Sequence, residues 1–227
     1  MLQFYFSLAP NPMKVALFLE EAGLPYQAIP VNTRKGEQHA PAFMALNPNA
    51  KVPVITDGDA VVFDSNAILL YLGEKTGQFM PADTAKARGE MLSWMMFIAS
   101  GIGPYAGQAV HFTRYAPEPR EYGANRYTFE AKRHFAIVEA RLARQAFMLG
   151  DDYTIVDMAL WGWARLIPFV LGEETMTAMP NLKRLVETIN ARPAAERAIG
   201  LKDKHVFEAV PDEVARGNMF RHLATPA

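Results

Sequence analysis

An asparagine flanked by two prolines stands near the beginning of the chain, in the stretch SLAPNPMKVAL. Here an apolar strand pattern gives way to a helical one, and a helix N-terminus stabilises anions through its unpaired backbone N–H groups and its dipole. A thiolate is such an anion, so Asn11 is a candidate to hold ionised sulfur. The alternative is purely structural, because Asn is a good N-cap and Pro12 would then occupy the preferred first helical position.

A second candidate lies in the stretch NPNAKVPVI, where Pro53 precedes an apolar strand. If the Val52–Pro53 bond is cis, the backbone of Val52 turns outward and can pair with an extended peptide. Only about 5–6% of X–Pro bonds are cis, so the dipeptide alone does not decide this, and a proline that limits strand growth is the alternative. Lys51 beside it can meet a carboxylate or can simply be solvated.

A third candidate is the stretch FDSNAILL, in which Ser65 opens a predicted helix. The N-terminal amides of that helix can hold a carboxylate, and Asp64 can accept a hydrogen bond from an amine. Capping of the helix by Ser65 is the structural alternative. Together the three stretches describe a small acidic peptide with an amino-acid head, an extended middle and a thiol near Asn11. Glutathione fits that description.

The chain of 227 residues contains no cysteine. This excludes disulfides, thiolate metal ligands and a cysteine nucleophile, so the sulfur of any thiol chemistry must come from a bound ligand. The five histidines are scattered without a ligand-pair spacing, and we expect no metal site.

The charge and hydropathy patterns exclude several partners. The net charge of −1, from 23 basic and 24 acidic residues, gives no electrostatic case for nucleic acid or an acidic membrane surface. No apolar run approaches the ~20 residues that a membrane helix needs. The apolar N-terminus lacks a basic leader and stops at proline, so we interpret it as a strand rather than a signal peptide and expect a cytoplasmic protein.

The first 80 residues alternate strand and helix in the order β-α-β-α-β-β-α. Gly23 and Gly77 stand where helices would stop, and Asp57-Gly58 joins two β-branched runs as a tight hairpin turn. Such an order predicts helices packed on a small mixed sheet. The predicted strands lie at 2–8, 25–32 and within the hairpin 52–64, and the predicted helices at 13–23, 39–48 and 65–77.

From about Thr84 the pattern becomes helical throughout. Phe129, Phe135, Val138 and Leu142 are spaced so that one helix can gather them on one face. With a linker at 79–83, the chain divides into an α/β domain over residues 1–80 and an all-α domain over 84–227. The polar tail 203–227 either covers a site or is loose. Predicted helices cover 85–103, 124–148, 155–171 and 182–192.

The stretches LEEAGLPY, NPNAKVPVI, FDSNAILLYLGEKTG and TIVDMAL occur in the order and approximate spacing of glutathione transferases, and residues 2 to 200 resemble that family. Within it, APNPMKV, KGEQHAPAF, IGPYAGQAVHF and NRYTFEAKR resemble the nu-class branch. That branch includes bacterial disulfide-bond oxidoreductases and a fungal nitrogen regulator. The resemblance implies a thioredoxin-like N-terminal domain, an all-helical C-terminal domain and a homodimer.

The resemblance also implies roles for individual residues in binding glutathione. Asn11 would lie near the sulfur, and Val52-Pro53 would be a cis-proline site that pairs with the cysteinyl backbone. The remaining contacts divide between the γ-glutamyl head, held by Asp64 and Ser65, and the glycyl end, near Gln38 and Lys51. The nu-class pattern admits a second glutathione, with its carboxylate on Arg126 and with Gln108 and Tyr127 lining that part of the cleft.

The sequence departs from the nu-class pattern at Ala9, where many members carry threonine. The change removes a hydroxyl that could bond the thiolate, and a hydrogen bond to a charged group is worth roughly 1.5–3 kcal/mol. Asp64 replaces the usual glutamate, and Asn66 replaces a frequent glycine. Thr154 and Asp157 fit a capping box that starts a buried helix, with a catalytic aspartate as the alternative.

Three functional hypotheses follow. The first is an enzyme in which the glutathione thiolate reduces a disulfide, or a peroxide, with a second glutathione supplying the resolving sulfur. The second is conjugation, in which the same thiolate attacks an electrophilic carbon. The third is a non-catalytic glutathione-binding regulator, to which Ala9 gives some weight.

Overall fold

The computed structural model describes residues 1–118 and 120–223. Four strands form one mixed sheet in the spatial order β2-β1-β3-β4. Strand β1 is parallel to β2, whereas β3 is antiparallel to both β1 and β4. The predicted hairpin is confirmed, with Gly58 at φ 61° between its strands. The strands are β1 (Leu2–Phe6), β2 (Tyr26–Pro30), β3 (Val54–Asp57) and β4 (Ala60–Phe63).

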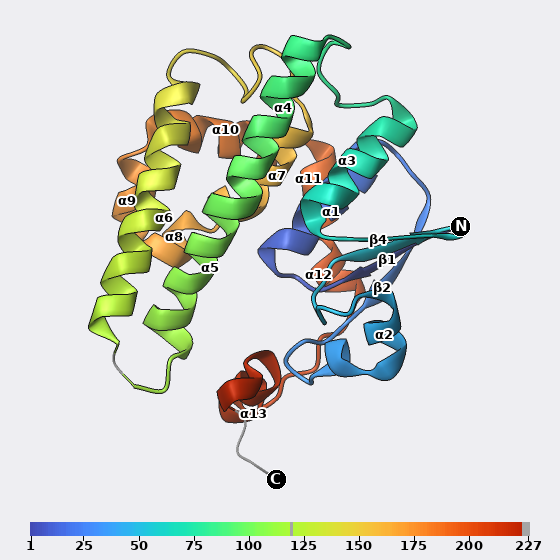
Figure 1. Ribbon diagram of the computed structural model, residues 1–227, viewed down its shortest axis with the longest axis vertical. Helices are drawn as coiled ribbons and strands as arrows, with labels where there is room; N and C mark the ends of the chain where they lie inside the picture. The colour runs from blue at the N-terminus through green and yellow to red at the C-terminus, as the bar shows by residue number, and fades with distance from the viewer. Residues whose placement is uncertain (119, 224–227) are drawn as a thin grey trace.

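Helices α1 (Pro10–Glu21) and α3 (Ser65–Thr76) cover one face of this sheet, and α2 (Pro41–Leu46) lies on the other (Figure 1). Alternation along β1 explains the division, because successive side chains point to opposite faces. Phe4 and Phe6 join the large core beneath α1 and α3, whereas Tyr5 packs with Phe43 of α2. The predicted α/β N-terminal domain with a thioredoxin-like sheet is therefore confirmed.

The elements that follow α3 are helical, as the sequence predicts. Two π-helical turns, η2 and η3, continue α4 through α5, and the 3-10 turns η1 (Glu37–His39) and η4 (Arg221–Leu223) lie outside this bundle. The α-helices and π turns of the bundle are α4 (Ala85–Phe97), η2 (Ile98–Ile102), α5 (Gly103–Val110), η3 (His111–Tyr115), α6 (Glu121–Leu142), α7 (Ile155–Ala164), α8 (Ile167–Leu171), α9 (Glu173–Thr177), α10 (Pro180–Asn190), α11 (Pro193–Ile199), α12 (Leu201–Lys204) and α13 (Asp212–Met219).

Several details of the predicted helices are wrong. The helix expected over 124–148 ends, as α6, at Leu142. The helix expected over 155–171 breaks into α7 and α8, because Pro168 has no N–H with which to continue the ladder from α7. Phe129 is 62% exposed, whereas Phe135, Val138 and Leu142 are buried. Six residues separate Phe129 from Phe135, which places it about 240° around the helix from that buried face.

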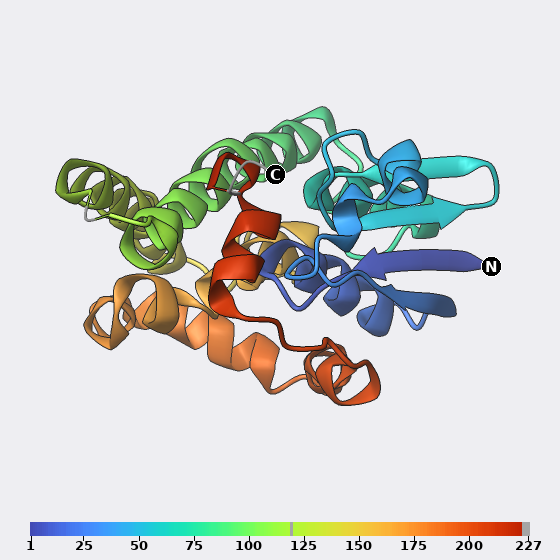
Figure 2. The same ribbon diagram turned by 90° about the horizontal axis from the view of Figure 1, so that it is seen from below.

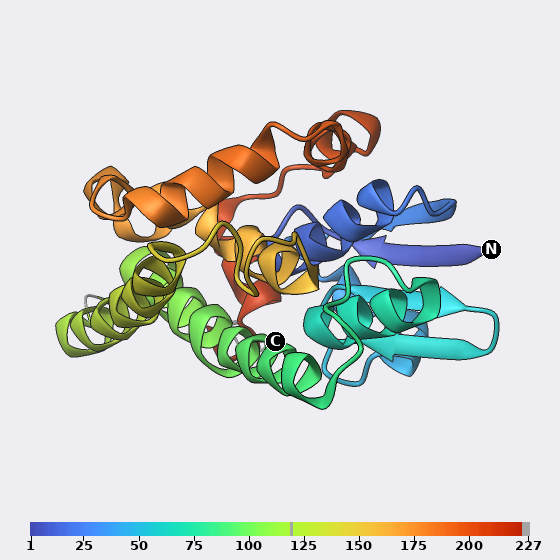
Figure 3. The same ribbon diagram turned by 90° about the horizontal axis from the view of Figure 1, so that it is seen from above.

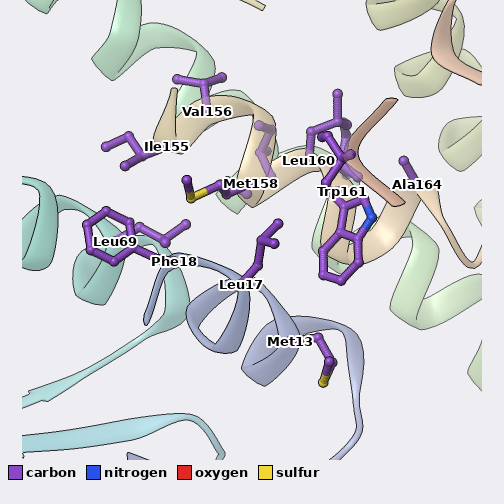
Figure 4. Close-up of a cluster of buried hydrophobic side chains, with 14 of the residues drawn as sticks. Met13, Leu17, Phe18, Leu69, Ile155, Val156, Met158, Leu160, Trp161 and Ala164 are labelled. Carbon is purple, nitrogen blue, oxygen red and sulfur yellow. The ribbon is translucent and has the colours of Figure 1, made fainter. Parts of the chain in front are cut away.

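One continuous core joins the two domains. Helix α7 packs along α1, and the apolar side chains between them interdigitate, with Leu17 and Phe18 of α1 facing Met158 and Trp161 of α7 (Figure 4). Seen from above, α7 lies in the middle of the molecule, between the sheet and the long helices α4 and α6 (Figure 3). The predicted capping box starts this helix: Thr154 Oγ1 accepts the Val156 N–H, and Asp157 accepts the Thr154 N–H at 2.9 Å.

The C-terminal segment, residues 205–223, crosses between the two halves of the molecule (Figure 2). It contacts the loop that follows β2 and then reaches the end of α5. Of the two alternatives for the tail, covering a site is the one that this arrangement favours; residues 224–227 lie outside the described residues. No helix among the described residues is long and apolar enough to span a bilayer.

Candidate functional site

Asn11 does not cap the first helix, so the structural alternative that Pro12 follows a cap at Asn11 is wrong. Helix α1 begins at Pro10, and Ala9 is its N-cap without a side-chain hydrogen bond. Pro10 takes the first helical position, where its missing N–H costs nothing. Pro12 also lacks an N–H, and the Met13 N–H donates to Ala9 O at 3.3 Å. In the described part of this turn, the helix therefore offers an anion one free backbone N–H, that of Asn11, rather than several.

Asn11 lies in a cleft between the N-terminal domain, α7 and the C-terminal segment. We call it the main cleft; it encloses about 300 Å³. It brings together four predicted site residues from three distant parts of the sequence: Asn11, Gln38, and the neighbours Lys51 and Val52. Its full lining is Ser7, Ala9, Pro10, Asn11, Pro12, Thr33, Gln38, Ala50, Lys51, Val52, Trp163, Met219 and Phe220.

A second hollow of about 250 Å³, the head pocket, shares Asn11, Lys51 and Val52 with the main cleft. Its other lining residues are Asn47, Asn49, Pro53, Phe63, Asp64 and Ser65. All seven residues predicted to contact the first glutathione therefore line one or both of two adjoining hollows. Their size and polar rims suit a tripeptide that runs from one hollow into the other.

The Val52–Pro53 bond is cis. Val52 precedes β3, whose ladder begins at Val54, so Val52 is outside the strand pairing, and it lines both hollows. The side chain of Asn47 fixes the backbone of residues 49–51, which precede the cis bond. Its Nδ2 donates to Lys51 O at 2.7 Å, and its Oδ1 accepts the Asn49 N–H at 3.0 Å. The arrangement leaves Val52 able to pair with an extended peptide backbone.

Asp64, rather than Ser65, is the N-cap of α3, so the capping role expected for Ser65 is wrong. One carboxylate oxygen of Asp64 accepts the N–H groups of Asn66 at 2.9 Å and Ala67 at 3.2 Å. Ser65 is the first helical residue, buried at the floor of the head pocket. Asp64 keeps its second oxygen for an amine, and the Ser65 hydroxyl remains available to a carboxylate.

A buried lysine, which the sequence did not single out, lies beneath the head pocket. Lys14 is 1% exposed, and its Nζ donates to Ser65 Oγ at 3.3 Å. Burial lowers the pKa of Lys14 to about 7, and the negative charge of Asp64 opposes that shift. An amine that titrates near neutrality therefore contacts the hydroxyl that we expect to bind the glutamyl head.

The C-terminal segment lines the part of the main cleft that contains Gln38. Asn218 O accepts hydrogen bonds from Gln38 Nε2 at 3.0 Å, and it lies 3.1 Å from His39 Nε2. Phe220 packs against His111 and Tyr115, with ring centroids 4.6 and 5.4 Å apart. The amide nitrogen of Gln38 is thus engaged by the chain itself, and Met219 and Phe220 form an apolar wall that no local sequence pattern indicated.

The residues expected around a second glutathione do not all meet. Arg126 and Tyr127 line a separate hollow with Phe112, and Tyr127 stacks on the Phe112 ring at 5.3 Å. Arg126 pairs with Glu130 at 2.8 Å while its side chain stays about half exposed. Gln108 is exposed on α5 and lines neither this hollow nor the main cleft. Within residues 1–118 and 120–223, no group of three acidic or histidine side chains could hold a metal ion.

A thioredoxin-like sheet with a cis proline beside a helix start, followed by a helical domain, is an arrangement that suits a bound thiol peptide. Two family models match the chain: the N-terminal domain of glutathione S-transferase over residues 9–75, and the C-terminal domain over residues 107–193. The chain belongs to the glutathione S-transferase family.

Individual relatives place the chain more closely within the family. It is 37% identical over 206 residues to the disulfide-bond oxidoreductase YfcG of Escherichia coli (strain K12), a match that covers 88% of this chain and 94% of that protein. It is 38% identical over 214 residues to YghU of the same organism, another disulfide-bond oxidoreductase, covering 86% and 73%. The chain lies on the branch of the family that contains these oxidoreductases.

A solved structure supports the same placement. The glutathione transferase of Burkholderia graminis, crystallised with two glutathione molecules bound per subunit, superposes with a TM-score of 0.84. It is 38% identical to this chain, and the match covers 90% of this chain and 89% of that one.

Proposed function

We propose that this protein is a glutathione-dependent disulfide-bond reductase. The observation that carries the proposal is the convergence of Asn11, the cis Val52–Pro53 bond and Ser65 on two adjoining hollows. The names of its relatives YfcG and YghU support the same reaction. Because the sequence contains no cysteine, the attacking sulfur belongs to glutathione.

The proposed reaction is thiol–disulfide exchange in two steps. Asn11 offers its backbone N–H and its carboxamide to the sulfur, which favours the thiolate over the thiol. The thiolate attacks one sulfur of the substrate disulfide, a mixed disulfide forms, and the other sulfur leaves as a thiolate that takes up a proton. A second glutathione thiolate then attacks the mixed disulfide, which releases oxidised glutathione and the second reduced thiol.

We propose that Gln38, Lys51, Val52, Pro53, Asp64 and Ser65 bind the first glutathione. Val52 pairs with the cysteinyl backbone, Asp64 and Ser65 hold the glutamyl head, and Lys51 meets the glycyl carboxylate. Gln38 supports the glycyl end once its amide is released from, or shared with, Asn218 O. The lining of the main cleft and head pocket supports these assignments.

The second glutathione is a separate part of the proposal, with Arg126 as its carboxylate partner and Gln108 and Tyr127 beside it. Two glutathione molecules per subunit in the Burkholderia graminis relative support it. Arg126→Ala should then slow disulfide reduction and raise the KM for glutathione. Unchanged disulfide-reductase kinetics would remove Arg126 from this role.

Two other classes of substrate could react with the same glutathione thiolate. A peroxide would be reduced by attack on its O–O bond, and an electrophilic carbon would be conjugated. Parallel turnover assays with 2-hydroxyethyl disulfide, a hydroperoxide and chlorodinitrobenzene rank the three, and we expect the disulfide to be fastest. A protein that binds glutathione yet turns over none of them would instead be a regulator, which Ala9 in the main cleft favours because it gives the sulfur no hydroxyl.

The direct test of sulfur activation is Asn11→Ala. Loss of a hydrogen bond to the thiolate should raise the pKa of the bound thiol by about 1–2 pH units, since such a bond is worth roughly 1.5–3 kcal/mol. Thiolate absorbance of bound glutathione, titrated against pH, measures the change against free glutathione in the same buffer. If the wild-type thiol ionises no more readily than free glutathione, the proposed function fails.

We further propose a nu-class, cytoplasmic homodimer in which the N-terminal domain of one subunit contacts the helical domain of the other. Exposed apolar side chains on both domains, Phe63 on β4 and Met96 on α4, support an interface. We also propose that the two domains divide between residues 80 and 84, in the linker that joins α3 to α4. Light scattering of the purified protein should give twice the mass of one chain.

A further inference from the structure

The carboxamide of Asn11 has a partner in the other domain. Trp163 Nε1, on α7, donates to Asn11 Oδ1 at 3.0 Å, across 152 positions of sequence. Both side chains line the main cleft and both are half-buried. An indole N–H can only donate, so the oxygen of the carboxamide must face Trp163. The NH₂ group of Asn11 is consequently turned away from the indole.

The indole has little freedom to move from this position. Its Nε1 lies so close to α5 that a Cβ on Gly103 would come within 3.3 Å of it, and a Cβ on Gly107, one turn later, would lie in contact with the ring at 3.6 Å. On the neighbouring residue of α7, a Cβ on Gly162 would come within 2.6 Å of Pro10 O. Because Gly162 has no side chain, α7 packs directly against the first turn of α1. Because Gly103 has none, the indole of Trp163 packs against α5.

We propose that Trp163 is a positioning residue that fixes the Asn11 carboxamide with its NH₂ group toward the sulfur. The inference rests on the proposed function, because it concerns the residue expected to hold the thiolate. Without the indole donor, the carboxamide can turn about its Cβ–Cγ bond and present its oxygen to the sulfur. An oxygen there repels a thiolate, whereas the NH₂ group donates to it.

The two prolines around Asn11 make this orientation matter more. Pro10 and Pro12 contribute no N–H, so the described residues of the helix start offer the sulfur only the backbone N–H and the carboxamide of Asn11. One of the two donors that the helix start offers therefore depends on which way the amide of Asn11 faces. Because α7 holds the indole, the helical domain takes part in activating a thiol that the N-terminal domain binds.

The test is Trp163→Phe, which removes the indole N–H while keeping an aromatic ring against α5. We expect the pKa of the thiol of bound glutathione to rise by about one pH unit. We also expect kcat for disulfide reduction at neutral pH to fall by about tenfold. The KM for glutathione should change little, because the head pocket is untouched. A packing role alone would lower stability without moving the thiol titration.

A matched control lies two residues away on the same helix. Trp161 Nε1 donates to Asn190 Oδ1 at 2.8 Å, a bond of the same type that is remote from the main cleft. Trp161→Phe and Asn190→Ala should lower the melting temperature but leave the pKa of bound glutathione at its wild-type value. A rise in the thiol pKa in both Trp→Phe variants would mean that the rise does not depend on the bond from Trp163 to Asn11, and it would overturn the inference.

Two further measurements separate the possible failures. In an Asn11→Ala background, Trp163→Phe should produce no additional rise in the thiol pKa, since the residue acts through Asn11. Should Trp163→Phe not fold, the indole N–H resonances serve instead: Asn11→Ala should shift one of the three and speed its hydrogen exchange. If Asn11→Ala raises the thiol pKa but leaves all three resonances unchanged, the proposed function stands and the role of Trp163 fails.

Discussion

At the scale of single residues, the prolines around Asn11 decide which groups can meet an anion. A helix start normally offers several backbone N–H groups, but Pro10 and Pro12 remove two of them. The helix dipole remains, but the hydrogen-bond donors at this helix start are reduced to the backbone N–H and the side-chain NH₂ group of Asn11. Substitution of this residue should therefore change the thiol chemistry more than it changes the stability of the helix.

Lys14 is the second residue whose chemistry the fold alters. A buried amine without a carboxylate partner is costly when charged, which is why burial lowers its pKa. Among the described residues its side chain makes one hydrogen bond, to Ser65 Oγ, which is too little to offset the loss of hydration. We infer that the amine is kept because it contacts the head pocket rather than because it stabilises the fold.

Lys14→Met tests this inference through the pH dependence of stability. The unfolded chain binds the lysine proton up to pH 10.5, whereas the folded chain releases it near pH 7. The unfolded state therefore holds more protons across that window, so the wild-type free energy of unfolding should rise with pH relative to that of the variant. Denaturant unfolding of both proteins at pH 7 and pH 10 measures the difference. The exposed Lys86→Met is the control and should follow the wild-type profile.

At the scale of elements, the loop before α7 is organised by one carboxylate. Asp157 accepts N–H groups from Met148 at 2.7 Å and Thr154 at 2.9 Å, and the Thr154 hydroxyl at 3.1 Å. It is fully buried and lies outside the main cleft. Its role is to start α7 in the orientation that brings Trp163 to Asn11, so the interpretation as a capping box rather than a catalytic acid is supported.

Asp157→Asn should destabilise the protein without abolishing the thiol chemistry. The NH₂ group that replaces one carboxylate oxygen cannot accept a backbone N–H, and an unpaired buried donor costs about 1–3 kcal/mol. Thermal unfolding measures the loss, with the exposed Asp151→Asn as the control. A variant of normal stability but without turnover would return Asp157 to the list of catalytic candidates.

The C-terminal segment is the other element that shapes the cleft. It is tied to the N-terminal domain by the bonds of Asn218 and by ion pairs such as Arg34 with Asp212 at 2.7 Å. Its attachment to the helical domain rests on the Phe220 ring between His111 and Tyr115. Exposed ion pairs contribute little, so the aromatic contacts should decide how firmly the segment is held: His205 and Phe207 with Phe6 at its beginning, and Phe220 near its end.

Phe220→Ala should therefore open the segment while the rest of the fold stays intact. A loss of about 1.4 kcal/mol raises the open population tenfold, and proteolysis follows that population when opening is fast. We expect limited proteolysis to cut residues 205–223 about ten times faster, with an unchanged melting temperature. Val206→Ala, at a position 83% exposed in the same segment, is the control and should be cut at the wild-type rate.

At the scale of the whole molecule, the two domains share one hydrophobic core that runs from β1 through α1 and α7 to α10. Two ion pairs also join the domains. Arg197 pairs with Glu20 at 2.7 Å, and Arg192 pairs with Glu21. Removing either domain would expose the apolar faces of α1 or α7. The domains are therefore expected to unfold together.

A single cooperative transition is the expected outcome of denaturant unfolding. All three tryptophans lie in the helical domain, at positions 94, 161 and 163, so their fluorescence reports that domain while far-ultraviolet circular dichroism reports the whole chain. The two midpoints should coincide, as two-state behaviour requires. A fluorescence transition that precedes the loss of circular dichroism would mean that the helical domain unfolds alone.

The sequence by itself determined the order of the elements, the Asp57-Gly58 hairpin, the capping box at Thr154 and the three stretches that line the main cleft and the head pocket. These features depend on residues within about four positions of one another, where helical periodicity, turn residues and caps act. Local rules still left choices open. They favoured Ser65 as the cap of α3 over its neighbour Asp64, and they grouped Phe129 with a face that it does not share.

Only the tertiary structure decided which distant groups meet. The bond from Trp163 to Asn11, the cover of Gln38 by Asn218 and the contact of Lys14 with Ser65 join positions 152, 180 and 51 residues apart. No periodic pattern encodes such pairs, because they depend on how closely whole helices approach. That approach is set by small contacts such as Gly162 against Pro10, whose meaning appears only when α7 lies on α1.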